Sequence, residues 1–166
     1  MPQITVLGLG NPLFKDDGIG PRAVRELQKK GLPPGAAAVE ATGSLFHYWD
    51  VLARSTRLIA VDAFYGGGPP GAVYLLSPEQ IPRPAAGSPA ALFRHEDDFL
   101  ACLDLLAYFG IKPPVTIVGV EPKEITYSLS LSPELTKKLP AILKIIRALI
   151  EDQDGIIRLK KEYRLY

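Results

Sequence analysis

Short apolar segments recur along the chain, and segments of helical length lie between most of them. The apolar segments occupy residues 4–9, 36–41, 57–62, 72–76 and 115–121. Most are rich in branched side chains and too short for buried helices, which is typical of strands covered on both faces. Strands that alternate with helices predict an α/β fold: a three-layer α/β/α sandwich around a mostly parallel, twisted sheet. The segment at 72–76 directly follows another strand, so a mixed sheet is also open.

Helices are expected where apolar residues recur with helical spacing: residues 22–30, 45–53, 94–109 and 133–151. With 166 residues, the chain is long enough for one domain with a substantial core. We expect a single domain over residues 1–155. Residues 156–166 alternate basic and apolar side chains. We expect them to extend the same domain, either as an edge strand or as another ordered segment.

The first apolar segment leads into a turn that carries two adjacent carboxylates. Gly8 and Gly10 allow a tight backbone path, and Asp16 and Asp17 follow just before a helix that begins near Pro21. In an open α/β sheet, ligands bind at this carboxyl edge of the strands. The sequence therefore predicts a functional site at this turn.

Two further candidate ligands are expected near the same edge. Asp62 ends the third apolar segment, and a doubly wound sheet places its first and third strands side by side. His95 lies where a loop meets the helix at 94–109. Carboxylate and imidazole groups together suit Zn²⁺, Ni²⁺ or a similar divalent ion.

Each candidate also has a simpler structural interpretation. Asp16 or Asp17 could cap the following helix. Adjacent residues of an extended turn point in opposite directions, so only one of the two is expected to face the site. Asp62 could cap the glycine turn at residues 66–68, and His95 could be a solvated residue at a helix start. From the residues alone, these alternatives stay open.

The composition restricts the class of protein. A net charge of +1 provides no global field for nucleic acid or an anionic membrane. Cys102 is the only cysteine, which excludes a disulfide framework, and it is expected to be a core thiol. His47 lies among aromatic residues and is expected on a partly buried helix face with a structural role. Residues 1–3 lead directly into the first strand without a signal-like segment, so a cytoplasmic location is expected.

Familiar nucleotide and nucleophile motifs do not occur. Leu13 occupies the position of the third glycine in a dinucleotide fingerprint, and no Gly-Lys-Ser/Thr or Gly-x-Ser-x-Gly sequence is present. The two carboxylates inside the turn would repel a pyrophosphate. The turn is therefore better suited to a cation than to a phosphate.

Residues 8–20, Gly-Leu-Gly-Asn-Pro-Leu-Phe-Lys-Asp-Asp-Gly-Ile-Gly, resemble the amino-terminal signature of the hydrogenase maturation endopeptidases. Proteins of that family remove a C-terminal extension from the large subunit of nickel-iron hydrogenases. The likeness continues through the segments 42–43, 58–63, 71–75 and 118–122 and the helix that contains His95. It therefore covers nearly the whole chain.

The resemblance implies a site made of two carboxylates and a histidine. Asp17, Asp62 and His95 fall at the family's metal-binding positions, although the family often has Glu where this chain has Asp17. Asp17 and Asp62 are then the expected catalytic residues. Asn11, Asp16 and Gly43 are expected to support the turns, with Asp16 holding the first one.

The resemblance also implies a substrate and a mechanism. The partner is a hydrogenase large-subunit precursor whose nickel is already installed, so nickel arrives with the substrate and no organic cofactor is needed. No serine or cysteine nucleophile is evident, which favours direct attack by water. Either the metal or one of the two carboxylates activates that water. We expect a monomer that binds neither nucleic acid nor membrane.

Two alternative functions compete with this interpretation. Peptidyl-tRNA hydrolases also open with Gly-Leu-Gly-Asn-Pro after a strand, but a Tyr and a His-Asn pair should follow soon. Here Lys15, Asp16 and Asp17 follow instead. The second alternative is a non-catalytic chaperone that binds the nickel-loaded precursor and leaves its length unchanged.

Overall fold

The computed structural model describes residues 3–83, 95–152, 156–163 and 165, with only the backbone described at residues 95–97. Its sheet contains β1 (Ile4–Gly8), β2 (Ala36–Glu40), β3 (Arg57–Ala63), β4 (Val73–Leu76) and β5 (Val115–Val120). The strand order is β2-β1-β3-β5-β4. All neighbours pair in parallel except β4, which runs antiparallel to β5.

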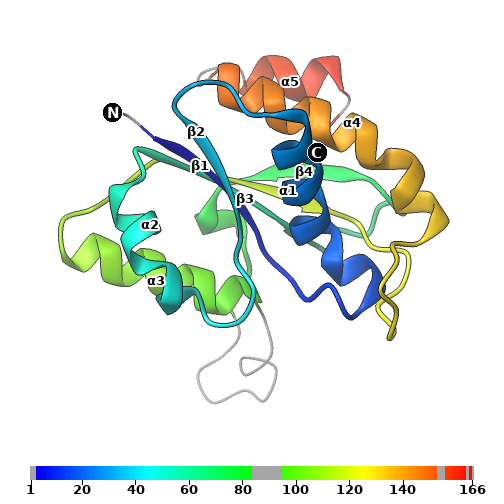
Figure 1. Ribbon diagram of the computed structural model, residues 1–166, viewed down its shortest axis with the longest axis horizontal. Helices are drawn as coiled ribbons and strands as arrows, with labels where there is room; N and C mark the ends of the chain where they lie inside the picture. Colours follow the sequence, from blue (N-terminus) through cyan, green and yellow to red (C-terminus); the bar gives the residue numbers. More distant parts are fainter. Residues whose placement is uncertain (1–2, 84–94, 153–155, 164, 166) are drawn as a thin grey trace.

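Helices cover both faces of this sheet (Figure 1). The α-helices are α1 (Ile19–Lys30), α2 (Trp49–Arg54), α3 (His95–Tyr108), α4 (Pro133–Glu151) and α5 (Ile156–Glu162). Short 3-10 helices are η1 (Lys15–Gly18), η2 (Leu45–Tyr48) and η3 (Pro78–Gln80). α1, α4 and α5 lie on one face of the sheet, and α2 and α3 lie on the other.

The alternation of side chains along each strand produces two separate cores. Val6 of β1 packs in the core beneath α1 and α4, whereas its neighbour Leu7 packs in the core beneath α2 and α3. Ile59 and Ala60 of β3 divide in the same way. The expected three-layer sandwich with a mixed sheet is confirmed.

The described elements differ from the expected ones in a few places. α1 begins at Ile19, three residues before the expected start at 22. The helix expected at 45–53 is divided into η2 and α2. The tail forms α5 instead of an edge strand, and Leu159 is buried in the same core as α1 and α4. Among the described residues, no helix has the length and apolar character that crossing a membrane requires.

The parallel strands bring several connections to one edge of the sheet. β1, β3 and β5 run in the same direction, so the segments 9–18, 64–72 and 121–132 all begin at their carboxyl ends. In Figure 1 the start of α1 and the loop before α4 lie close together at this edge. The adjacency of β1 and β3, which the predicted site requires, is confirmed.

Candidate active site

Asp17 lies in η1, in the turn between β1 and α1. Its carboxylate oxygen Oδ2 accepts a hydrogen bond from the backbone N–H of Asn11 at 2.9 Å, and its side chain is partly exposed. α1 starts after Gly18 without a cap from any described side chain. The interpretation of Asp16 or Asp17 as a helix cap is therefore wrong, and the Asp17 carboxylate instead faces the turn that follows β1.

Asp16 points away from Asp17 and is fully buried. Its carboxylate accepts backbone N–H groups from Lys123, Glu124 and Ser132, at 2.8, 3.2 and 2.8 Å. Hydrogen bonds to a buried carboxylate are charge-assisted and strong. Asp16 thus fastens the first turn to the loop between β5 and α4.

Asp62 lies near the end of β3, where its side chain is only 2% exposed. Its Oδ1 atom accepts the N–H of Ala63 at 2.8 Å. Because Gly10 has no side chain, this carboxylate can lie close to the first turn. A methyl group at Gly10 would lie 2.0 Å from the Asp17 carbonyl oxygen and 3.3 Å from Asp62 Oδ1. The Asp17 turn and the Asp62 carboxylate therefore meet at one corner.

A second carboxylate holds the glycine loop that follows Asp62. Glu121, just after β5, is buried and accepts the Gly66 N–H at 2.6 Å and the Tyr74 hydroxyl at 2.8 Å. The Tyr74 oxygen in turn accepts the Gly68 N–H at 2.9 Å. The glycine turn at residues 66–68 is therefore capped by Glu121 and not by Asp62, which was the simpler structural interpretation of Asp62.

Tyr65 carries a hydroxyl group at the same corner. It lies on the loop after Asp62 and is 68% exposed. Partial burial raises the pKa of its phenol, and the negative charges of Asp17 and Glu121 raise it further. At neutral pH this hydroxyl keeps its proton and can donate a hydrogen bond.

His95 is the first residue of α3. The start of α3 is tied to the turn after β2, because Leu45 donates its backbone N–H to Asp98 Oδ2 at 2.6 Å. Asp98 follows His95 by three residues, which is nearly one helical turn. The His95 side chain lies outside the described residues. Among the side chains that are described, no three His, Cys, Asp or Glu groups form a metal-binding cluster.

Three further residues singled out by the sequence lie elsewhere. Gly43 has a positive φ of 76° in the turn after β2. His47 is exposed in η2, so the expectation of a partly buried position is wrong. Cys102 is fully buried in the core beneath α3, as expected, and burial raises the pKa of its thiol to about 11.

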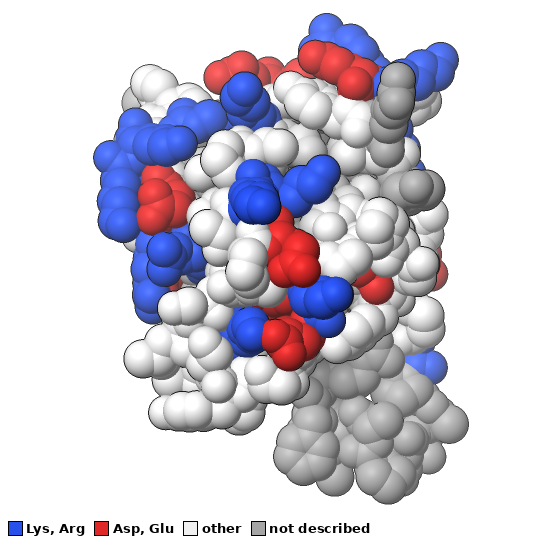
Figure 2. Space-filling model, turned by 90° about the vertical axis from the view of Figure 1, so that its right-hand side faces the viewer, with Lys and Arg blue, Asp and Glu red and all other residues white. Residues whose placement is uncertain are grey.

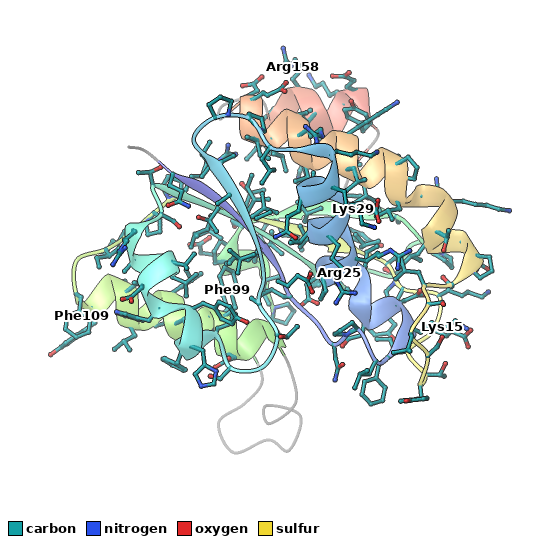
Figure 3. The ribbon with its side chains drawn as sticks, viewed as in Figure 1. Lys15, Arg25, Lys29, Phe99, Phe109 and Arg158 are labelled. Atoms are coloured by element: carbon teal, nitrogen blue, oxygen red, sulfur yellow. The ribbon has the colours of Figure 1, made fainter. Side chains whose placement is uncertain are left out.

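Exposed apolar side chains border the corner that contains Asp17. Leu13 and Phe14 precede η1, and Tyr127 and Leu129 lie on the loop between β5 and α4. The rings of Phe14 and Tyr127 contact each other edge to face, with centroids 6.4 Å apart. Figure 2 shows this end of the molecule, where acidic and basic side chains intermingle beside an uncharged area. Figure 3 places Lys15 here and Phe109 at the opposite end.

A separate cavity of about 660 Å³ lies at the amino edge of the sheet, between η3, α3 and the start of β5. Its walls include Ile81, Leu100 and Val115, and the ion pair of Arg83 with Asp104 stands on its rim. None of the predicted site residues whose side chains are described lines it. The cavity is therefore independent of the Asp17 corner.

Sequence reasoning assigned no role to Glu121, Tyr74 or Tyr65. Glu121 had a recognisable signal, because β5, like β3, is an apolar strand that leads into a single carboxylate. Tyr74 and Tyr65 had none, since nothing in the sequence shows which of its seven tyrosines faces a carboxylate.

Comparisons with known proteins agree with this arrangement. The family model described as hydrogenase maturation protease matches residues 21–149. The chain is 30% identical over 165 residues to the hydrogenase expression/formation protein HupD of Thiocapsa roseopersicina, covering 97% of this chain and 73% of the relative. It is 29% identical to the hydrogenase 2 maturation protease of Escherichia coli, covering 90% and 92%.

A solved structure shares the fold. The hydrogenase maturating endopeptidase HybD from Escherichia coli superposes with a TM-score of 0.76 at 27% identity, over 90% of this chain and 93% of that one. The family model alone, over residues 21–149, spans well over half of the chain. The chain therefore belongs to the family of hydrogenase maturation proteases.

Proposed function

We propose that the protein cleaves the C-terminal extension from a nickel-iron hydrogenase large-subunit precursor after nickel has been inserted. The observation that carries this proposal is the meeting of the Asp17 turn and the Asp62 carboxylate at Gly10. Family membership supplies the reaction class, a peptide hydrolysis, and the carboxyl edge of a parallel sheet is where such a site is expected.

In this proposal the nickel ion belongs to the substrate. Asp17, Asp62 and His95 contact it in the precursor, because two carboxylates and an imidazole form a ligand set that suits nickel. Contact with the ion distinguishes a loaded precursor from an empty one. The scissile bond is thereby placed beside the same two carboxylates.

The difference in burial between the two aspartates suggests different tasks. Asp17 is partly exposed and can reach a water molecule, so we assign it as the general base that takes the proton as water attacks the peptide carbonyl. The proton then passes to the departing amine. Asp62 is buried with one oxygen bound to the Ala63 N–H, so its role is to orient the substrate's metal.

The precursor is a protein, so it should contact surface around the site as well as the site itself. The exposed apolar side chains of Leu13, Phe14, Tyr127 and Leu129 surround the Asp17 corner and offer that contact. Large exposed apolar groups gathered in one place are typical of protein-binding surfaces.

The proposal can be tested with purified precursor that carries nickel. Mass spectrometry should show loss of the extension with the wild-type protein and with the control variant Asp104→Asn, whose exposed ion pair with Arg83 lies at the other end of α3. Asp17→Asn should lower kcat by about 10²–10⁴-fold if it removes the general base. Full activity in both Asp17→Asn and Asp62→Asn would sink the assigned site.

A further inference from the structure

One buried carboxylate joins the turn that carries Asp17 to the loop at residues 121–132. The two oxygens of Asp16 accept three backbone N–H groups of that loop, with distances between 2.8 and 3.2 Å. Oδ2 receives Lys123 and Glu124 near the start of the loop, and Oδ1 receives Ser132 at its end. A single side chain therefore closes the loop and attaches both of its ends to η1.

The same two segments also meet through their backbones. Lys15 donates its N–H to the Ser128 carbonyl at 2.9 Å, and Ser128 donates its own N–H to the Leu13 carbonyl at 2.9 Å. The side chains of Lys15 and Glu124 form an ion pair beside these bonds. Because these contacts add to the three bonds of Asp16, the turn and the loop form one connected unit.

The position of Asp17 depends on this unit. Asp17 follows Asp16 directly, and its carbonyl oxygen lies where a methyl group at Gly10 would be 2.0 Å away. Space for movement on that side is therefore small. If the Asp16 bonds were lost, the turn would lose its attachment to Lys123, Glu124 and Ser132 and would keep the backbone bonds to Ser128 that precede Asp16.

We infer that Asp16 is a positioning residue that fixes the Asp17 carboxylate through the loop at residues 121–132. The inference rests on the proposed function, which gives the Asp17 carboxylate its task. The same bonds hold the exposed Tyr127 and Leu129 side chains beside the site. The surface that is expected to contact the precursor therefore stays in a fixed position relative to the Asp17 carboxylate.

The variant Asp16→Asn tests this role because it keeps the size of the side chain. An amide has only one oxygen, so its NH₂ group must face at least one of the three N–H donors that the carboxylate accepted. We expect hydrogen exchange at the amides of Lys123, Glu124 and Ser132 to accelerate at least about tenfold. An error of about 1 Å in the position of a reacting group costs about 10²-fold, so kcat should fall by about 10- to 100-fold.

The controls separate positioning from a loss of folding. Asp104→Asn should leave both exchange and kcat at wild-type values. In Asp16→Asn the loss should appear in kcat per folded molecule, with KM changed less than about threefold. A purely structural role would instead lower the melting temperature and leave kcat per folded molecule unchanged, and that outcome overturns the inference.

Two further outcomes are decisive. If Asp16→Asn does not fold, hydrogen exchange in the wild-type protein still tests the Asp16 bonds on which the inference rests. The amides of Lys123, Glu124 and Ser132 must then exchange more slowly than those of Ile125 and Tyr127 in the same loop, and equal rates overturn the inference. If the wild-type protein leaves the precursor uncut, the proposed function fails, whereas the exchange result continues to report on the Asp16 bonds alone.

Discussion

The Tyr74 hydroxyl donates a hydrogen bond to the Glu121 carboxylate at 2.8 Å, although the two residues lie 47 positions apart in the chain. Both are buried. Through Gly66 and Gly68, this pair holds the loop that follows Asp62. The antiparallel strand β4 therefore has a function at the site, because it delivers Tyr74 to the end of β5.

Tyr74→Phe should destabilise the protein by about 1–3 kcal/mol, because it leaves the buried Glu121 carboxylate and the Gly68 N–H each without one partner. Urea unfolding measures the change. Tyr108 is 83% exposed, so Tyr108→Phe serves as the control and should change stability by less than about 0.5 kcal/mol. Equal stability of Tyr74→Phe and the wild type would contradict the role of this hydrogen bond.

Gly10→Ala should destabilise the protein strongly. The φ of Gly10 is 113°, and the added methyl group would overlap the Asp17 carbonyl oxygen at 2.0 Å. Backbone strain of about 1–3 kcal/mol and overpacking of about 1–3 kcal/mol together predict a loss of about 2–6 kcal/mol.

Gly43→Ala is the matched control for this substitution. Gly43 also has a positive φ, but a methyl group there would meet no atom of the described residues within 4 Å. Only the cost of the left-handed backbone remains, about 1–2 kcal/mol. If denaturant unfolding gives the same loss for both variants, Gly10 is not a point of close approach between the two aspartates.

The pKa of Tyr65 should report on the charge of Asp17. A neighbouring negative charge disfavours the phenolate, and Asp17 is among the groups that raise the pKa of Tyr65. Asp17→Asn removes that charge, so the pKa of Tyr65 should move down toward the ordinary tyrosine value. NMR titration of ring-labelled tyrosine measures the shift. Asp104→Asn should leave the pKa of Tyr65 unchanged. If Asp17→Asn also leaves this pKa unchanged, Tyr65 does not sense the charge of Asp17 and is not part of the site.

Cys102 should be inert toward thiol reagents in the folded protein. Its side chain is fully buried, and burial raises the pKa of the thiol to about 11. At pH 8 the reactive thiolate is therefore a minor species, and the reagent also lacks access. A chromogenic disulfide reagent should label the native protein slowly and the unfolded protein at once. Rapid labelling accompanied by loss of activity would point to a catalytic cysteine.

The sequence predicted the sheet well because its signals are local. β1, β3 and β5 are almost entirely buried, so their composition alone marks them as strands. The spacing of the glycines and carboxylates in residues 8–20 identified the first turn and, with it, the family. The comparisons support a peptidase, and they favour neither a peptidyl-tRNA hydrolase nor a non-catalytic chaperone.

The tail and His47 show why the remainder was harder to predict. Ile156, Leu159 and Tyr163 follow a helical spacing and pack against the core, but the tail is too short for that pattern to be distinguished from a strand. His47 lies in a 3-10 turn, where the periodicity of an α-helix does not apply and the burial of its aromatic neighbours gives no guide.

The candidate site could be predicted only in part. Asp62 was identified because it ends an apolar strand, and Asp17 because it lies in the turn after the first strand at a position that resembles the family's signature. The partners of Asp16 lie 107 to 116 residues away, and no local pattern indicates a pairing over that distance. The Glu121–Tyr74 pair is hidden for the same reason. Contacts between loops form only once the sheet has folded, so the sequence does not show them. A carboxylate at the end of an apolar segment, in contrast, can be recognised in the sequence itself.

The most direct test of the central claim compares two forms of the same precursor, one loaded with nickel and one without it. Intact mass is measured before and after incubation with the wild-type protein. Only the nickel-loaded precursor should lose its C-terminal extension, and Asp17→Asn should leave it whole. Equal cleavage of both forms, or cleavage of neither, would contradict the claim.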